Sequence, residues 1–60
     1  MTNHEFIQVV IHSWQSSNRD KYINMLVSDF IEHCGEVYKF DLDILTSEEY
    51  NYLVQVLVNT

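Results

Sequence analysis

The chain contains no proline, one glycine, one cysteine and only three Lys/Arg residues among its 60 residues. Without proline, and with Gly35 alone, it has no flexible linker and no low-complexity segment. A single Cys34 excludes an intrachain disulfide. No apolar run approaches the roughly 18 residues that a membrane span needs, and the N-terminus lacks the features of a signal peptide. We therefore expect one cytoplasmic domain over residues 1–60.

The scarcity of basic residues determines the charge of the molecule. Nine Asp/Glu against three Lys/Arg give a formal net charge of −6. The whole imbalance lies in residues 29–49, where Lys39 is accompanied by Asp29, Glu32, Glu36, Asp41, Asp43, Glu48 and Glu49. Nucleic-acid binding requires basic side chains that neutralise phosphates, so we expect no direct contact with nucleic acid. The electrostatic complement of this stretch is a basic surface on a partner protein.

The small size raises a question of stability. A domain of this length buries only about 60% of the surface that its unfolded chain exposes. The hydrophobic fraction is nevertheless 47%. We expect that some of this apolar surface is buried between molecules, and a homodimer is favoured over a monomer.

Three short motifs predict helix starts. In each, a hydroxyl residue precedes an acid by three positions, ahead of a helical apolar pattern, as in a capping box. The pairs are Thr2 and Glu5, Ser17 and Asp20, and Thr46 and Glu49. Hydrophobic staples are predicted for Met1 with Phe6 and for Leu45 with Tyr50.

The spacing of apolar residues predicts helices over about 3–15 and 18–34, and a third from Thr46 or Ser47 almost to the C-terminus. Gly35 is expected to end the second helix as a left-handed residue, because glycine adopts positive φ without steric cost. The first helix has an unusually broad apolar arc, which indicates a central position or a shared interface.

Residues 36–45 alternate between two kinds of side chain. Tyr38, Phe40, Leu42 and Ile44 alternate with Lys39, Asp41 and Asp43. This period of two predicts an extended segment over about 37–44 that turns its aromatic side inward. The fold class is therefore predicted as all-α, a small three-helix domain with an extended segment before helix 3. The alternative is α+β, with helices 1–2 packed on a C-terminal hairpin of 37–44 and 52–58.

Residue patterns typical of catalysis or metal binding are not found. His4 and His12 lie two helical turns apart, too far to share a metal ion. His33 and Cys34 are neighbours that diverge on a helix, and Cys34 near a helix C-terminus is unfavourable as a thiolate. We therefore expect no enzymatic activity, no cofactor and no metal.

The acidic stretch is the candidate partner-binding surface. Carboxylates spread over a small body can imitate the phosphates of a duplex, and exposed aromatic residues would anchor the contact. The predicted site is Glu36, Tyr38, Asp41, Asp43, Glu48 and Glu49. Trp14, Tyr38 and Tyr52 are the candidate aromatic anchors. The competing interpretation is an acidic surface that only keeps the protein soluble.

In size, acidity and lack of reactive groups, the chain resembles small inhibitors made by bacterial viruses, including anti-CRISPR, anti-restriction and polymerase-binding proteins. The resemblance rests on composition over the whole chain. It implies an inhibitor that blocks a basic, nucleic-acid-binding surface of a host or defence protein. The alternative function is a structural or regulatory homo-oligomer, or an accessory subunit, that acts through its apolar faces.

Overall fold

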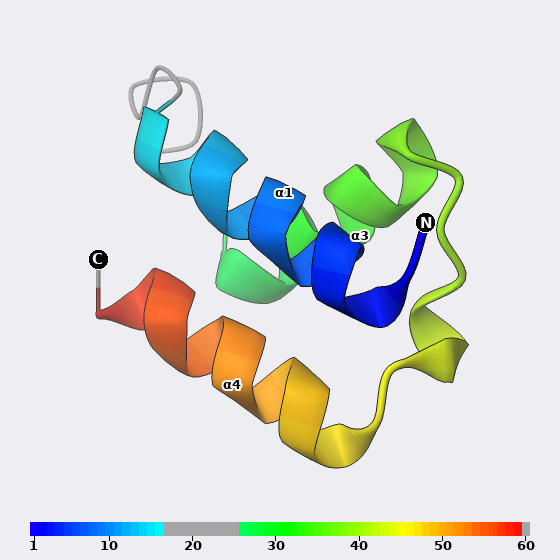
Figure 1. The fold of residues 1–60 in the computed structure, drawn as a ribbon. Coiled ribbons are helices and arrows are strands. Elements are labelled where there is room, and N and C mark those ends of the chain that lie inside the picture. Colours follow the sequence, from blue (N-terminus) through cyan, green and yellow to red (C-terminus); the bar gives the residue numbers. More distant parts are fainter. Residues whose placement is uncertain (17–25, 60) are drawn as a thin grey trace.

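The computed structural model describes residues 1–16 and 26–59. Its elements are α1 (Asn3–Ser16), α3 (Val27–Val37), the short 3-10 helix η1 (Leu42–Ile44) and α4 (Ser47–Val58) (Figure 1). These residues contain no β-strand, so the all-α prediction is confirmed. The alternative hairpin of 37–44 and 52–58 is wrong, because 52–58 belongs to α4.

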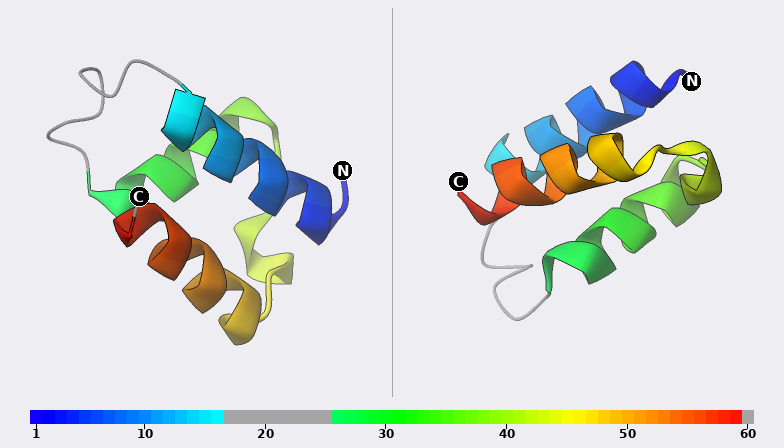
Figure 2. Two further views of the ribbon diagram at one scale, coloured as in Figure 1. Left: turned by 60° about the vertical axis from the view of Figure 1, so that its left-hand side comes forward. Right: turned by 90° about the horizontal axis from the view of Figure 1, so that it is seen from below.

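The helices form two layers. In Figures 1 and 2, α1 and α4 lie side by side and run in roughly the same direction, and α3 runs back across them in the second layer. Because α3 runs back across both helices, the three helices share one core, and α1 and α4 become neighbours although they are far apart in sequence. The start of α1, the start of α4 and the end of α3 consequently meet at one end of the molecule.

Capping boxes begin α1 and α4, as predicted. At α1, Glu5 N–H donates to Thr2 Oγ1 at 3.1 Å and Thr2 N–H donates to Glu5 Oε1 at 2.9 Å. At α4, Thr46 and Glu49 make the same two bonds at the same lengths. The predicted box at Ser17 and Asp20 lies outside the described residues. Of the predicted staples, Leu45 and Tyr50 both pack against the core, whereas Met1 is 59% exposed.

The second helix differs from its prediction at both ends. Leu26 has extended backbone angles (φ −67°, ψ 151°), so a helix that continues from 18 to 34 is wrong, although residues 18–25 themselves are outside the described part. α3 starts at Val27 and ends at Val37. The apolar spacing of 18–34 did not reveal the break, because Leu26 fits a helical pattern as well as its neighbours do.

Gly35 does not end α3, and Lys39 takes the left-handed position instead, with φ +54°. Phe40 N–H donates to the Gly35 carbonyl at 2.8 Å, and Lys39 N–H donates to the Glu36 carbonyl at 3.3 Å. These two bonds define a Schellman motif, in which the residue after the helix cap adopts positive φ. The prediction chose the wrong residue because glycine is the usual occupant of that position.

Close packing accounts for Gly35 within α3. A Cβ atom added there would lie 3.2 Å from Cγ of Leu42 and 3.4 Å from each of its methyl groups. Gly35 is buried, and Leu42, the first residue of η1, rests against it. The glycine therefore brings the connector against the end of α3 rather than supplying a turn.

The connector between α3 and α4 is not the predicted extended segment. Val37 is helical, Tyr38 and Lys39 form a turn, and η1 occupies 42–44. Asp41 Oδ1 accepts the N–H of Asp43 at 3.0 Å, and this bond begins η1. Only part of the expected alternation is observed: Phe40 is buried, whereas Ile44 remains 52% exposed.

Aromatic contacts join the layers of the core. Phe6 of α1 stacks on Phe40 of the connector with ring centroids 4.2 Å apart, and Trp14 forms a T-shaped pair with Phe30 of α3 with centroids 4.9 Å apart. Such pairs add about 0.5–1.5 kcal/mol beyond the area they bury. The buried core comprises Phe6, Ile7, Val10, Phe30, Ile31, Cys34, Phe40, Leu53 and Leu57. The broad arc of α1 is thus used within one chain.

The left-handed Lys39 gives a direct test of the helix end. Lys39→Gly is expected to raise the free energy of unfolding by about 1 kcal/mol, because a Cβ is strained at positive φ. Urea unfolding followed by circular dichroism measures this change. Lys39→Ala is the control, since it removes the same charge and keeps the Cβ. Equal stabilisation by both variants would assign the effect to charge.

Candidate functional site: an acidic hollow and a neighbouring groove

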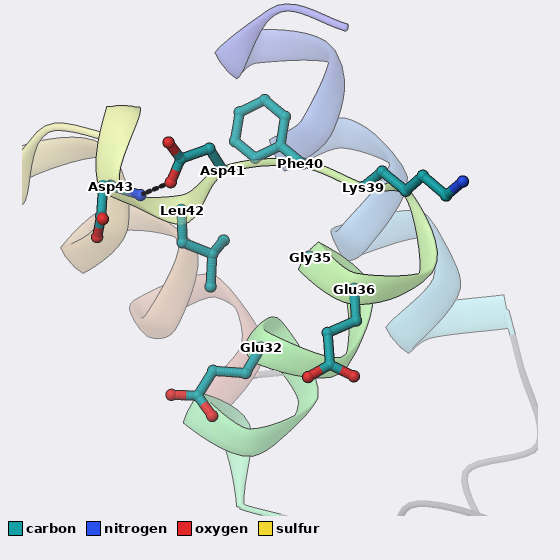
Figure 3. A pocket seen from close by; sticks show the side chains of 8 residues that line it. All are labelled: Glu32, Gly35, Glu36, Lys39, Phe40, Asp41, Leu42 and Asp43. Carbon is teal, nitrogen blue, oxygen red and sulfur yellow. Dashed lines mark hydrogen bonds between the residues drawn. The ribbon is translucent and has the colours of Figure 1, made fainter.

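Four carboxylates surround an open hollow of about 530 Å³ at the end of α3. Glu32 and Glu36 come from α3, and Asp41 and Asp43 come from the connector and η1 (Figure 3). We call this feature the acidic hollow. Its remaining lining residues are Gly35, Lys39, Phe40 and Leu42.

Leu42 and Lys39 determine the character of the acidic hollow. Leu42 projects between the four carboxylates, and its contact with Gly35 holds it there. Lys39 also lines the hollow, but its side chain extends away from the four carboxylates (Figure 3). The hollow thus has an apolar centre with exposed acids around it, an arrangement complementary to basic side chains with aliphatic stems.

Glu36 occupies a position that disfavours helix stability. It lies in the last turn of α3, where the helix dipole carries partial negative charge, and no basic residue lies in that turn. Glu32 precedes it by four residues on the same face, and like charges at this spacing repel. Both effects oppose a carboxylate at this site. Helix stability therefore offers no reason for Glu36.

A second concavity, which we call the α1–α4 groove, lies between the first turns of those helices. Its volume is about 370 Å³. It is lined by His4, Ile7, Gln8, Glu48, Glu49 and Tyr52. Tyr52 is 56% exposed and Ile7 is only 6% exposed. The groove therefore has an apolar base and an accessible aromatic ring beside two carboxylates.

Glu49 holds the two sides of this groove together. Its Oε1 accepts the N–H of Thr46 and also the side-chain amide of Asn3, both at 2.9 Å. The Asn3 amide donates in addition to the carbonyl of Ile44 at 3.1 Å. Both bonds lower the pKa of Glu49 below its usual value, and the bond from the Thr46 backbone has the larger effect. The bonds from Thr2 lower the pKa of Glu5 in the same way.

The predicted partner-binding residues divide between the two features. Glu36, Asp41 and Asp43 line the acidic hollow, whereas Glu48 and Glu49 line the α1–α4 groove. Tyr38 is 41% exposed at the C-terminal cap of α3 and lines neither.

Sequence reasoning left Glu32 and His4 out of the predicted site. Glu32 was detectable from its spacing of four residues to Glu36 on one helix. His4 had no such signal, because its place in the same groove as Glu48 depends on the packing of α1 against α4. Among the candidate anchors, Tyr52 is the most accessible, and Trp14 is half-buried against Phe30.

The histidines and the cysteine of the described residues lie apart from the two concavities, except for His4. His4, His12 and His33 are exposed, and no three His, Cys, Asp or Glu residues of 1–16 and 26–59 are arranged to hold a metal ion. Cys34 is buried in the core, and burial raises the pKa of its thiol to about 11. A thiol with this pKa is almost entirely protonated at neutral pH, which opposes nucleophilic chemistry.

Several large apolar side chains are exposed on a single chain. They are Met1, Leu26, Val37, Tyr38, Ile44, Tyr52 and Val58, and they lie in or beside α3, η1 and α4 and at the N-terminus. The predicted homodimer remains a prediction. No helix in the described part of the chain has the length and hydropathy required to cross a bilayer.

Comparison with known proteins yields no relative. No family model matches this sequence, and no curated protein or solved structure is significantly similar to it.

The lowered pKa values of Glu5 and Glu49 predict acid sensitivity. A depressed pKa means that the folded state favours the carboxylate, so this stabilisation is full above about pH 4.5 and is lost as the pH falls through the folded-state pKa. Urea midpoints measured over about pH 3 to 6 should fall as the pH drops below about 4.5. Glu5→Gln/Glu49→Gln should flatten this fall, because glutamine can keep the capping bonds without titrating. Glu32→Gln is the control and should leave the fall unchanged.

Glu36 and Glu48 should respond oppositely to the same substitution. Glu36→Gln is expected to stabilise the protein by about 0.3–1 kcal/mol, because it removes an acid from a helix C-terminus. Glu48→Gln should destabilise it by a similar amount, because Glu48 lies in the first turn of α4. Chemical unfolding at low ionic strength measures both, and added salt should shrink both effects. A loss of stability in Glu36→Gln would contradict the assignment of Glu36 as structurally unfavourable.

Proposed function

We propose that this protein is a small non-enzymatic binding protein that covers a basic, nucleic-acid-binding surface of a partner protein through its acidic hollow. The mechanism is steric: the bound protein occupies the surface that phosphates would otherwise contact. This is the mode of action implied by the resemblance to small acidic inhibitors from bacterial viruses.

The observation that carries the proposal is the position of Glu36. Helix stability disfavours a carboxylate there, yet Glu32, Asp41 and Asp43 add three further acids around the same hollow. Clustered like charges destabilise a folded state, and residues that oppose stability without structural compensation concentrate at functional surfaces. A basic partner would relieve the repulsion on binding. A surface that only confers solubility does not require this clustering, because dispersed acids serve that purpose equally well.

Leu42 adds a contact that charge alone does not provide. Exposed ion pairs contribute about 0.2–1 kcal/mol each, so affinity requires buried apolar contact as well. The half-buried Leu42 at the centre of the hollow supplies an apolar surface for the aliphatic stem of a Lys or Arg side chain.

A matched set of variants tests the role of the acidic hollow. Glu32→Gln/Glu36→Gln/Asp43→Asn removes three charges from it and spares Asp41, whose carboxylate begins η1. Affinity for a fluorescent deca-lysine peptide at low salt should fall about tenfold, because three exposed ion pairs of about 0.5 kcal/mol are lost. Fluorescence anisotropy measures this affinity, and its dependence on salt should become shallower.

The control variant changes the net charge equally at exposed positions elsewhere. Gln15→Lys/Asn51→Lys/Gln55→Lys adds three positive charges outside the hollow. It should weaken binding much less than the variant in the hollow. An equal loss in both variants would show that overall charge, and not the acidic hollow, attracts the basic peptide.

A further inference from the structure

We propose that the α1–α4 groove binds one arginine side chain of the basic partner, so that the partner is distinguished by arginine rather than by positive charge alone. This inference rests on the proposed function and adds the identity of the side chain that is recognised. The inference concerns the groove and the proposed function concerns the acidic hollow, so an experiment can contradict one and leave the other standing.

Two facing strips of helix build the groove. On α4, Glu48 and Tyr52 are four residues apart and lie on one face; on α1, His4 and Gln8 have the same spacing. Buried Ile7 forms the base between them. The Asn3–Glu49 bond fixes the distance between the starts of the two helices. The site is therefore held by secondary structure and does not depend on a loop.

The chemistry of these side chains favours a guanidinium. A planar guanidinium can stack on the ring of Tyr52 while its N–H groups bond to a neighbouring carboxylate. Glu48 is exposed one helical turn from that ring. Glu49 Oε1 accepts hydrogen bonds from the Asn3 side chain and the Thr46 N–H, and these two bonds fix the orientation of the carboxylate at the edge of the groove. Gln8 presents a side-chain amide whose oxygen can accept a further N–H.

Lysine fits the same groove less well. Its ammonium is a compact and strongly hydrated charge that cannot make parallel bonds to a carboxylate and stacks poorly on a ring. The loss of stacking corresponds to about a fivefold difference in affinity between the two side chains.

The test compares two peptides of equal charge, one of alternating glycine and arginine and one of alternating glycine and lysine. Each is titrated into the ¹⁵N-labelled protein at low salt. The arginine peptide should bind about fivefold more tightly. Its resonance shifts should include residues 4–8 and 48–52. Tyr52→Leu should abolish the fivefold preference, whereas Tyr52→Phe should retain it because the ring remains.

Three outcomes would overturn the assignment. Equal affinity for both peptides, with shifts confined to α3 and η1, would leave the acidic hollow as the binding surface and remove the groove. Shifts at 48–52 that depend on protein concentration without peptide would show that a second copy of the chain occupies the groove. No shift with either peptide would overturn the groove and the proposed function together.

Discussion

The carboxylate of Glu49 accepts hydrogen bonds from two places that are distant in sequence, and these bonds tie together the elements that meet at one end of the molecule. The Thr46 N–H belongs to the capping box of α4, and the Asn3 amide belongs to the first turn of α1. Asn3 also bonds to the carbonyl of Ile44, which places η1 beside the N-terminus. Glu49 thereby caps α4 and joins it to α1, and Asn3 links the same point to the connector. The α1–α4 groove and the acidic hollow adjoin the elements that meet there.

The acids at this end have two different physical roles. Glu5 and Glu49 are stabilised by backbone N–H groups at helix starts, and this lowers the pKa of each. Glu36 lies at a helix end, where the dipole and Glu32 both disfavour it. Net charge alone does not separate these groups. Because the first kind serves folding, the second kind is the stronger indication of an interaction surface.

Local motifs were predicted well because their physics involves few neighbouring residues. The boxes at Thr2 and Thr46 require only a hydroxyl and an acid three positions apart, and the structure contains both. The end of α3 was predicted wrongly, because the choice between Gly35 and Lys39 depends on where Leu42 packs. The alternation over 37–44 also misled, since Asp41 begins the 3-10 helix η1 there and only part of the alternating pattern is buried.

The amino-acid sequence by itself determined the helical class, two of the helix starts and the concentration of acids in residues 29–49, because capping and charge are local properties. Only the tertiary structure decided how those acids are grouped. The return of α3 beneath α1 and α4 assigns Glu36, Asp41 and Asp43 to one concavity and Glu48 and Glu49 to another. The groove depends on contacts between residues more than 40 positions apart, such as Asn3 with Glu49, which are 46 positions apart, and no spacing along the chain encodes them.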